Sequence, residues 1–247
     1  MTDRQGRPVT GLTAPDFTVS EDGHPQSITT LAAGDFPLAV AVALDRSFSM
    51  GDRVAVAKSA ACAFVGELRP VDQVMVLAVG SETETAAPLT TDHRAALAAI
   101  GRLDRWGTTP LYDATVAALD AVEPAKGRRA LVLLSDGTDR YSRTSASELL
   151  DHARRSNVLI YPVAIGPARP PIFAELATAT GGRSFYEKTP ANLQATMGVI
   201  AQELRFQNLL GYTPARTPGD EPQWRSIEVR VNRADVIVRA RDGYFSR

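Results

Sequence analysis

The stretch that most constrains the fold is an uncharged apolar run that ends in a cluster of polar residues. Residues 38–44 read LAVAVAL, Asp45 follows at once, and Ser47 and Ser49 come at alternate positions after it. Such a run, rich in Val and Ala, is typical of a strand buried on both faces of a sheet. Parallel strands deliver their last residues to the carboxyl edge of the sheet, where α/β proteins bind ligands. The sequence therefore predicts a polar site after this strand.

The residue types at this predicted site suit a metal ion. One carboxylate and two hydroxyl groups form an all-oxygen set of low charge, which hard divalent cations such as Mg²⁺ or Mn²⁺ prefer. Taken alone, the pattern Asp-x-Ser-x-Ser is weak, because Ser and Asp are also common in turns and helix caps. The alternative interpretation is that Ser49 or Asp52 caps the helix that follows.

The rest of the central region alternates between predicted strands and predicted helices. Strands are expected at residues 73–79, 83–87 (an edge strand), 130–134, 158–165 and 183–186. Helices are expected at residues 52–68, 91–103, 111–122, 145–156, 172–180 and 192–206. Strands that alternate with helices over short loops specify an α/β domain, with a mostly parallel sheet covered on both faces.

Both ends of the chain read differently from this central region. Residues 16–21 and 26–31 predict a β-hairpin, while residues 209–212, 224–231 and 235–245 predict antiparallel strands with turns at Pro218-Gly219 and Asn232-Arg233. The predicted organisation is an N-terminal β-hairpin extension over residues 1–34, an α/β domain over 35–206, and C-terminal strands over 207–247 that pack with the hairpin.

Composition excludes several classes of function. The chain is 44% hydrophobic and 22% charged, which suffices for an ordinary core. Its net charge is −1 and its Lys and Arg residues are scattered, which argues against binding to nucleic acid or to a membrane surface. No apolar run approaches the ~20 residues of a membrane span. The start, MTDRQGRPVTG, lacks the apolar stretch of a signal peptide, so a soluble chain is expected.

Two further polar loops join the first one. The loop WGTTP carries Thr108 and Thr109, and the buried strand ALVLL (residues 130–134) ends at Ser135-Asp136-Gly137. Because Asp45 and Asp136 each follow a buried parallel strand, both are expected at the same edge of the sheet. If the two strands are neighbours, the site lies at a topological switch point, where α/β sheets bind ligands.

The three segments LDRSFSMG, WGTTPLYDA and LVLLSDGTD resemble the metal-ion-dependent adhesion site of von Willebrand factor type A (VWA) domains. The similarity covers about residues 35–206. Asp45, Ser47 and Ser49 match the first part of the family motif, Thr109 (with Thr108 as the fallback) the second, and Asp136 the third. The flanks GRPVTGLTAPDFTVSEDG, LLGYTPA and WRSIEVRVNRADVIVRARDGYF resemble a bacterial VWFA-related subgroup. Members of that subgroup usually begin earlier, with a signal peptide, and are often exported.

The resemblance implies a Rossmann-like sheet with one antiparallel edge strand and a metal ion at its top. Mg²⁺, or alternatively Mn²⁺ or Ca²⁺, would be held by Asp45, Ser47, Ser49, Thr109 and Asp136. In the family the last coordination position is left for an Asp or Glu of a partner protein. The charge balance agrees with this, because two carboxylates leave a divalent ion roughly neutral and ready for a third.

A rim of arginine and aromatic residues is predicted around the site. Arg46 and Phe48 alternate with the proposed ligands and are expected to point away from the ion. Together with Trp106, Arg140 and Tyr141 they would recognise an acidic segment of another protein, since such residues are favoured anchors at interfaces. The alternative is that Phe48 and Trp106 pack underneath the loops.

Two other functions remain open from the sequence. An Asp after a buried strand also occurs in metal-dependent phosphoryl-transfer enzymes, with Asp45 as the nucleophile. Ser47 stands where such sites commonly have a second carboxylate, and the three loops contain no Lys and no nucleotide-binding motif, so no enzymatic activity is expected. The other alternative is a structural or scaffold domain with no metal-regulated binding.

Overall fold

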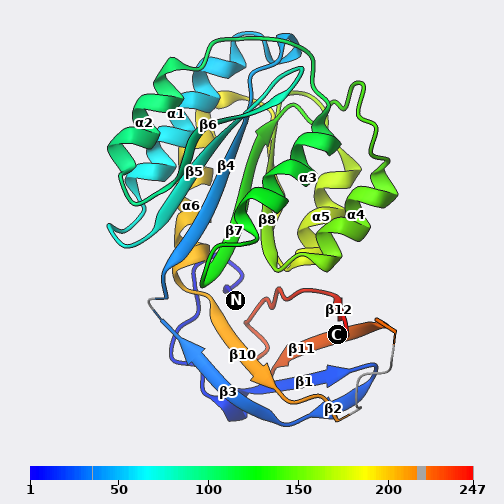
Figure 1. The fold of residues 1–247 in the computed structure, drawn as a ribbon. Coiled ribbons are helices and arrows are strands. Elements are labelled where there is room, and N and C mark those ends of the chain that lie inside the picture. Colours follow the sequence, from blue (N-terminus) through cyan, green and yellow to red (C-terminus); the bar gives the residue numbers. More distant parts are fainter. Residues whose placement is uncertain (35, 216–220, 247) are drawn as a thin grey trace.

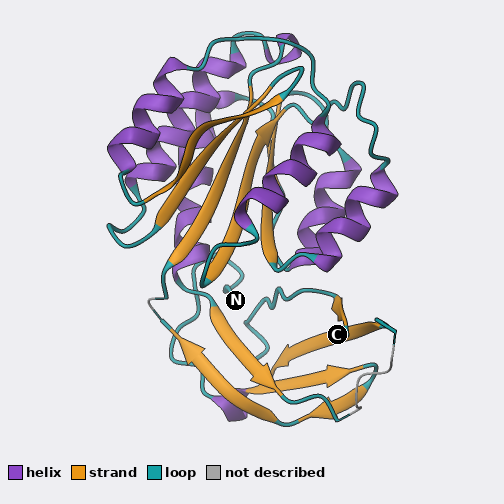
Figure 2. Cartoon of the chain, in the orientation of Figure 1, coloured by secondary structure: helices purple, strands orange, loops and turns teal. Residues whose placement is uncertain are grey.

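A six-stranded sheet with helices on both faces forms the larger part of the structure, a computed structural model that describes residues 1–34, 36–215 and 221–246 (Figures 1 and 2). The strands run in the order β6-β5-β4-β7-β8-β9, and all neighbours are parallel except the pair β5–β6. Their bounds are β4 Leu38–Asp45, β5 Gln73–Val79, β6 Thr83–Thr90, β7 Arg128–Ser135, β8 Val158–Ile165 and β9 Phe185–Glu187. This confirms the predicted α/β class with a single antiparallel edge strand.

Strand β4 forms the centre of this sheet, and all eight of its residues are buried. Val40, Val42 and Leu44 pack into the hydrophobic cluster on one face, whereas the intervening alanines pack into the cluster on the other. The first face is covered by α1 (Arg53–Gly66), α2 (His93–Arg102) and α6 (Leu193–Arg205). The second is covered by α3 (Leu111–Val122), α4 (Ala146–Arg155) and α5 (Pro171–Thr180). Burial on both faces explains why β4 has no polar alternation.

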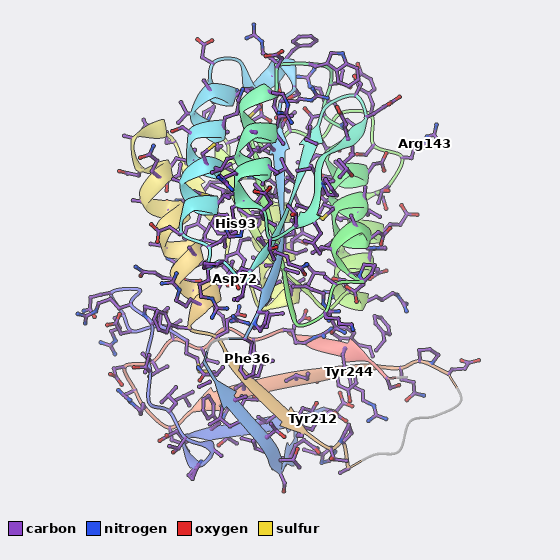
Figure 3. All side chains as sticks on the ribbon, turned by 60° about the vertical axis from the view of Figure 1, so that its left-hand side comes forward. Phe36, Asp72, His93, Arg143, Tyr212 and Tyr244 are labelled. Atoms are coloured by element: carbon purple, nitrogen blue, oxygen red, sulfur yellow. The ribbon has the colours of Figure 1, made fainter. Side chains whose placement is uncertain are left out.

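The start of β4 is fixed by a buried carboxylate at the amino end of the sheet. Asp72 accepts the backbone N–H of Leu38 at 3.1 Å and pairs with Arg69 at 2.8 Å. Arg69 also donates to the carbonyl of Phe36 at 2.7 Å. Figure 3 labels Asp72 and Phe36 near the junction with the second part of the molecule.

The topological switch point lies between β4 and β7. The chain leaves β4 for β5 on one side and, after β6, returns to β7 on the other side of β4. Leu44 is in register with Leu134, so the two strands end level with each other. The segments that follow β4 and β7 therefore lie side by side at the carboxyl edge.

The two chain ends together form a smaller antiparallel structure, which we call the β unit. Its strands are β1 Phe17–Glu21, β2 His24–Gln26, β3 Ile28–Ala33, β10 Asn208–Tyr212, β11 Trp224–Val231 and β12 Gly243–Phe245. They form one sheet of order β12-β11-β1-β2 and the pair β10–β3. The β unit lies beyond the amino end of the large sheet (Figure 1). Short 3₁₀ helices occur at Ala14–Asp16, Phe48–Met50 and Pro190–Asn192.

The predicted strand over residues 235–245 is wrong for most of its length. Only Gly243–Phe245 is a strand, and an isolated bridge joins Ile237 to Thr2. The segment leaves the sheet because Arg239 and Arg241 reach across to the α/β domain, where they bond Glu203 and Asn157. The predicted hairpin return is likewise split, since β2 pairs with β1 and β3 pairs with β10.

Some sequence predictions fall on residues that the structure does not describe. The turn predicted at Pro218-Gly219 lies outside the described residues, and so do Asp35, the first residue of the predicted α/β domain, and Arg247, the last of the predicted C-terminal segment. Within the described part of the chain, every helix is too short or too polar to cross a membrane.

A buried carboxylate fastens the strands of the β unit. Glu21 accepts hydrogen bonds from the hydroxyls of Tyr212 at 2.7 Å and Tyr244 at 2.8 Å, and from Arg225 at 2.9 Å. Burial alone raises the pKa of Glu21, but these three donors outweigh it and hold the pKa below its ordinary value. The charged form is therefore favoured in the folded state.

We expect Glu21→Gln to lower the thermal unfolding midpoint at pH 7, because it leaves the Arg225 guanidinium without its carboxylate. A carboxyl group with a lowered pKa stabilises the fold above its unfolded-state pKa, and this contribution is lost as the pH falls through the folded-state pKa. The difference between wild type and variant should therefore shrink in acid. Scanning calorimetry at pH 7 and pH 4 measures this difference in unfolding midpoint.

Glu228→Gln, which alters an exposed carboxylate on β11, is the control and should have little effect on the midpoint. An equal loss in both variants would contradict the assignment.

Candidate functional site

The three polar loops predicted from the sequence meet at the carboxyl edge of β4 and β7. Backbone hydrogen bonds tie the middle loop to the other two: Phe48 N–H to the Gly107 carbonyl at 3.0 Å, Trp106 N–H to that of Arg46 at 2.8 Å, and Arg140 N–H to that of Thr109 at 2.7 Å. The outer two loops are joined directly, because Ser135 Oγ donates to Asp45 Oδ2 at 2.6 Å. The predicted convergence of the loops is thus observed.

Asp45 is deeply buried, with 1% of its surface exposed, as are Ser47 and Thr109. One carboxylate oxygen accepts from Ser135 Oγ, and the other accepts from the backbone N–H of Ser47 at 2.9 Å. Burial raises the pKa of Asp45; the bonds from Ser135 and Ser47 oppose this rise, and the neighbouring Asp136 carboxylate adds to it. A cation close to Asp45 would favour its charged form, and each carboxylate oxygen keeps acceptor capacity for one.

Asp136 lies beside Asp45 and faces a cationic side chain. Its Oδ1 accepts the backbone N–H of Thr138 at 3.0 Å, and its Oδ2 is 3.5 Å from Nη2 of Arg53. Arg53 is otherwise bonded to backbone carbonyls, those of Met50, Ile165 and Ser49. The site therefore contains two carboxylates and one guanidinium at its border.

The hydroxyl groups of the predicted set differ in their exposure, since Ser47 is buried and Ser49 is exposed. Ser47 Oγ and Ser49 Oγ are 3.0 Å apart. Thr109 is 1% exposed, and its hydroxyl is buried without a hydrogen-bond partner among the described residues. Thr108, in contrast, is exposed, and its hydroxyl lies 3.4 Å from Ser81 Oγ. Of the two threonines left open by the sequence, Thr109 is the one directed inward, with an unused polar atom that costs free energy to bury.

The donor set fits a hard divalent cation. Two carboxylates and three hydroxyls offer only oxygen, and the buried hydroxyl of Thr109 lacks a partner that an ion would supply. No group of three or more His, Cys, Asp or Glu side chains suited to a metal occurs within the described residues. Metal binding by the mixed carboxylate and hydroxyl set accordingly stays a prediction.

The predicted rim residues surround the same edge. Phe48 is 65% exposed, Tyr141 is 80% exposed and Trp106 is 44% exposed. The Arg46 guanidinium lies 5.2 Å from the Trp106 ring centroid and pairs with Glu84 at 2.8 Å, and Arg140 is exposed. Phe48 and Tyr141 thus lie open to solvent, whereas Trp106 rests partly on the backbone of Gly80.

Sequence reasoning missed Arg53 and Ser135, both of which contact predicted ligands. Arg53 is the first residue of α1, where a cation is disfavoured by the helix dipole. An arginine at this unfavourable helix position could have indicated, from the sequence, that its side chain makes contacts outside the helix. For Ser135 the only signal was its place directly before Asp136.

Two further acidic residues hold the third loop against α3. Asp113 accepts the backbone N–H groups of Arg143 and Thr144, each at 2.9 Å. Asp139 accepts hydrogen bonds from the N–H of Tyr112 at 3.1 Å and from the hydroxyl of Ser142. Figure 3 labels Arg143 on this loop, at the margin of the domain.

Comparison with known structures places this architecture in an established fold. Protein BatB from Bacteroides thetaiotaomicron superposes with a TM-score of 0.57 at 20% identity, over 68% of this chain and 97% of that one. A von Willebrand factor type A protein from Catenulispora acidiphila gives 0.62 at 20% identity, over 79% of this chain and 51% of that one. The vWF domain of the type V pili tip protein Mfa5 from Porphyromonas gingivalis gives 0.60 at 14% identity, over 70% and 96%. At such identities these likenesses show the fold alone.

Sequence comparison agrees with the structural comparison. No curated protein matches the chain significantly. Residues 40–138, which run from β4 through the loop of Asp136, match the family model of the von Willebrand factor type A domain. The α/β part of this chain therefore has the fold of a VWA domain, and residues 40–138 also match that family in sequence.

Proposed function

We propose that the VWA domain is a metal-dependent protein-binding module and not an enzyme. Asp45, Ser47, Ser49, Thr109 and Asp136 would hold Mg²⁺ or a similar ion at the carboxyl edge of the sheet. The bound ion would supply a Lewis-acidic position for a carboxylate of the partner. The observation that carries this proposal is the buried, unpartnered hydroxyl of Thr109, which lies in the loop tied to both others.

The charge balance supports an acidic partner. Asp45 and Asp136 together neutralise a divalent ion, so a third carboxylate is attracted rather than repelled. Arg53, 3.5 Å from Asp136, adds a positive charge at the border of the site. An Asp or Glu side chain of another protein is therefore the ligand that this arrangement favours.

The rim supports a protein rather than a small carboxylate as the partner. Phe48 and Tyr141 expose most of their rings, and Trp106 with Arg46 forms a cation–π pair beside them. Tyr141 also has a left-handed φ of 70°, which is unfavourable for a bulky residue and is more often tolerated at functional sites. Aromatic and arginine side chains are favoured anchors of protein interfaces.

The first test is calorimetric titration of chelator-treated protein with Mg²⁺, Mn²⁺ and Ca²⁺. Saturable binding is expected, and Asp45→Ala should abolish it. Thr109→Val keeps the shape of the side chain but removes the hydroxyl, and should weaken binding by at least roughly 10-fold. Thr108→Val changes the exposed neighbour and is the matched control. Absence of binding to the wild type, or equal effects of both threonine variants, would contradict the proposed ligand set.

The second test concerns the rim. Immobilised protein is probed with an array of Asp- and Glu-containing peptides, in Mg²⁺ and in EDTA. Binding should require the metal, and Phe48→Ala with Trp106→Ala should weaken it by roughly 30-fold, since an anchor of this kind costs about 2 kcal/mol or more. Val71→Ala, which truncates another exposed apolar side chain, should leave peptide affinity unchanged. Peptide binding that EDTA and the rim variants do not alter would favour a scaffold domain.

The enzymatic alternative is tested separately. Both carboxylate oxygens of Asp45 accept hydrogen bonds in a deeply buried position, which does not favour a nucleophile. We therefore expect no metal-dependent hydrolysis of p-nitrophenyl phosphate by the chain. Turnover that Asp45→Asn abolished would overturn the view that the domain is not an enzyme.

A further inference from the structure

A cavity of about 590 Å³ lies between the VWA domain and the β unit. This volume is within the roughly 300–1,000 Å³ of small-molecule sites, which often occur where two structural units meet. The upper wall comes from the amino end of the large sheet, around Phe36, Arg129 and Val158, and the lower wall from β1, β10 and β11. Figure 3 labels Phe36 at this junction and Tyr212 on the β unit below it. The candidate metal site is at the opposite, carboxyl end of the same strands.

The lower wall is apolar because the side chains of its strands alternate between the cavity and solvent. Along β11 the side chains alternate, so that Ile227 and Val229 line the cavity while Ser226, Glu228 and Arg230 are exposed on the outer face. Leu210 and Val19 continue the apolar surface on neighbouring strands. Protein interiors are normally close-packed, so an apolar space of this size is unusual. Its walls could contact a ligand that fills it.

The cavity wall is lined by several guanidinium groups. Four arginines line it, Arg128, Arg129, Arg239 and Arg241, and no Asp or Glu among the described residues does so. Among the described residues, the hydrogen bonds of the Arg129 and Arg241 guanidinium groups go to neutral oxygens, while the carboxylates of Asp242 and Glu123 act on Arg241 from a distance. Arg129 bonds the carbonyls of Glu123 and Ala125; Arg241 bonds those of Gly243 and Arg154 and the side-chain oxygen of Asn157.

The carboxylate beside Arg239 is shared with a second arginine. Glu203 Oε1 pairs with Arg239 at 2.9 Å and also with Arg183 at 2.6 Å, so one negative charge faces two guanidinium groups. Burial lowers the pKa of Arg241, which shows that its charge is held in a poorly solvated place. An anionic head group in the cavity would offer Arg129 and Arg241 a charged acceptor where they now bond neutral oxygens.

We propose that this cavity binds a small amphipathic anion, with its apolar body against Ile227, Val229 and Leu210 and its head group at the arginines. The guanidinium group is planar and presents paired donors that match a carboxylate or a phosphate. A medium-length acyl or alkyl chain with either head group has the required chemistry. The site is independent of the metal site and involves none of its residues.

The test uses the wild-type chain in EDTA and four probes of equal chain length: decanoate, decyl phosphate, decanol and decyltrimethylammonium. Calorimetry should show saturable binding, with one ligand per chain, for at least one of the two anions. The alcohol should bind at least tenfold more weakly, and the cation should not bind. The ratio between decanoate and decyl phosphate identifies the preferred head group. No binding of either anion, or equal binding of all four probes, would overturn the proposal.

Matched variants place the ligand within the cavity. Val229→Trp should fill the space and abolish anion binding, whereas Glu228→Trp, one residue away on the outer face, should leave it unchanged. Arg129→Leu should reduce the preference for the anions over decanol. Asp136→Ala, at the other end of the sheet, should bind decanoate or decyl phosphate like the wild type. Normal binding by a folded Val229→Trp, checked by its thermal unfolding, would refute the location.

Discussion

The burial of the Asp45 carboxylate is the constraint on which the architecture of the candidate site depends. Asp45 ends the central strand of the sheet and is 1% exposed, so its charge must be compensated by its surroundings. The hydroxyl of Ser135, the last residue of β7, and the backbone N–H of Ser47, just after β4, each donate a hydrogen bond to it. The bond from Ser135 forms only if β4 and β7 are neighbours that end in register. The order of the strands in the sheet is therefore a condition for the hydrogen bonding of the buried carboxylate.

Most of the α/β fold and the convergence of three loops were predictable because strong local patterns encode them. The run of buried residues 38–44 and the similar run before Asp136 have no other plausible place than the middle of a sheet. The 235–245 segment was mispredicted because its β-like sequence is overruled by the tertiary contacts of Arg239 and Arg241. Contacts between residues so far apart in the sequence cannot be predicted from a local sequence pattern.

At the site, the sequence could assign residue types but not their directions. Thr108 and Thr109 are equivalent in the sequence, and only the folded loop distinguishes the exposed hydroxyl from the buried one. Arg53 illustrates the same limit. Its guanidinium reaches Asp136 across 83 positions of the chain, while it also fastens the carbonyls of Met50 and Ile165. A contact of this kind depends on the packing of α1 against the sheet edge.

The two ends of the large sheet differ in the charged side chains that they carry and in whether the β unit covers them. The loops at the carboxyl edge, which contain the candidate metal site, lie at the end of the sheet away from the β unit (Figure 1). At the amino edge, the β unit closes over the first residues of β7 and β8 and encloses an arginine-rich space. Because separate residues form the two regions, the ligand proposed for the cavity and the partner proposed for the candidate metal site need not compete. Strand β4 runs from one region to the other and is held at both ends, by Asp72 at one and by the bonds of Asp45 at the other.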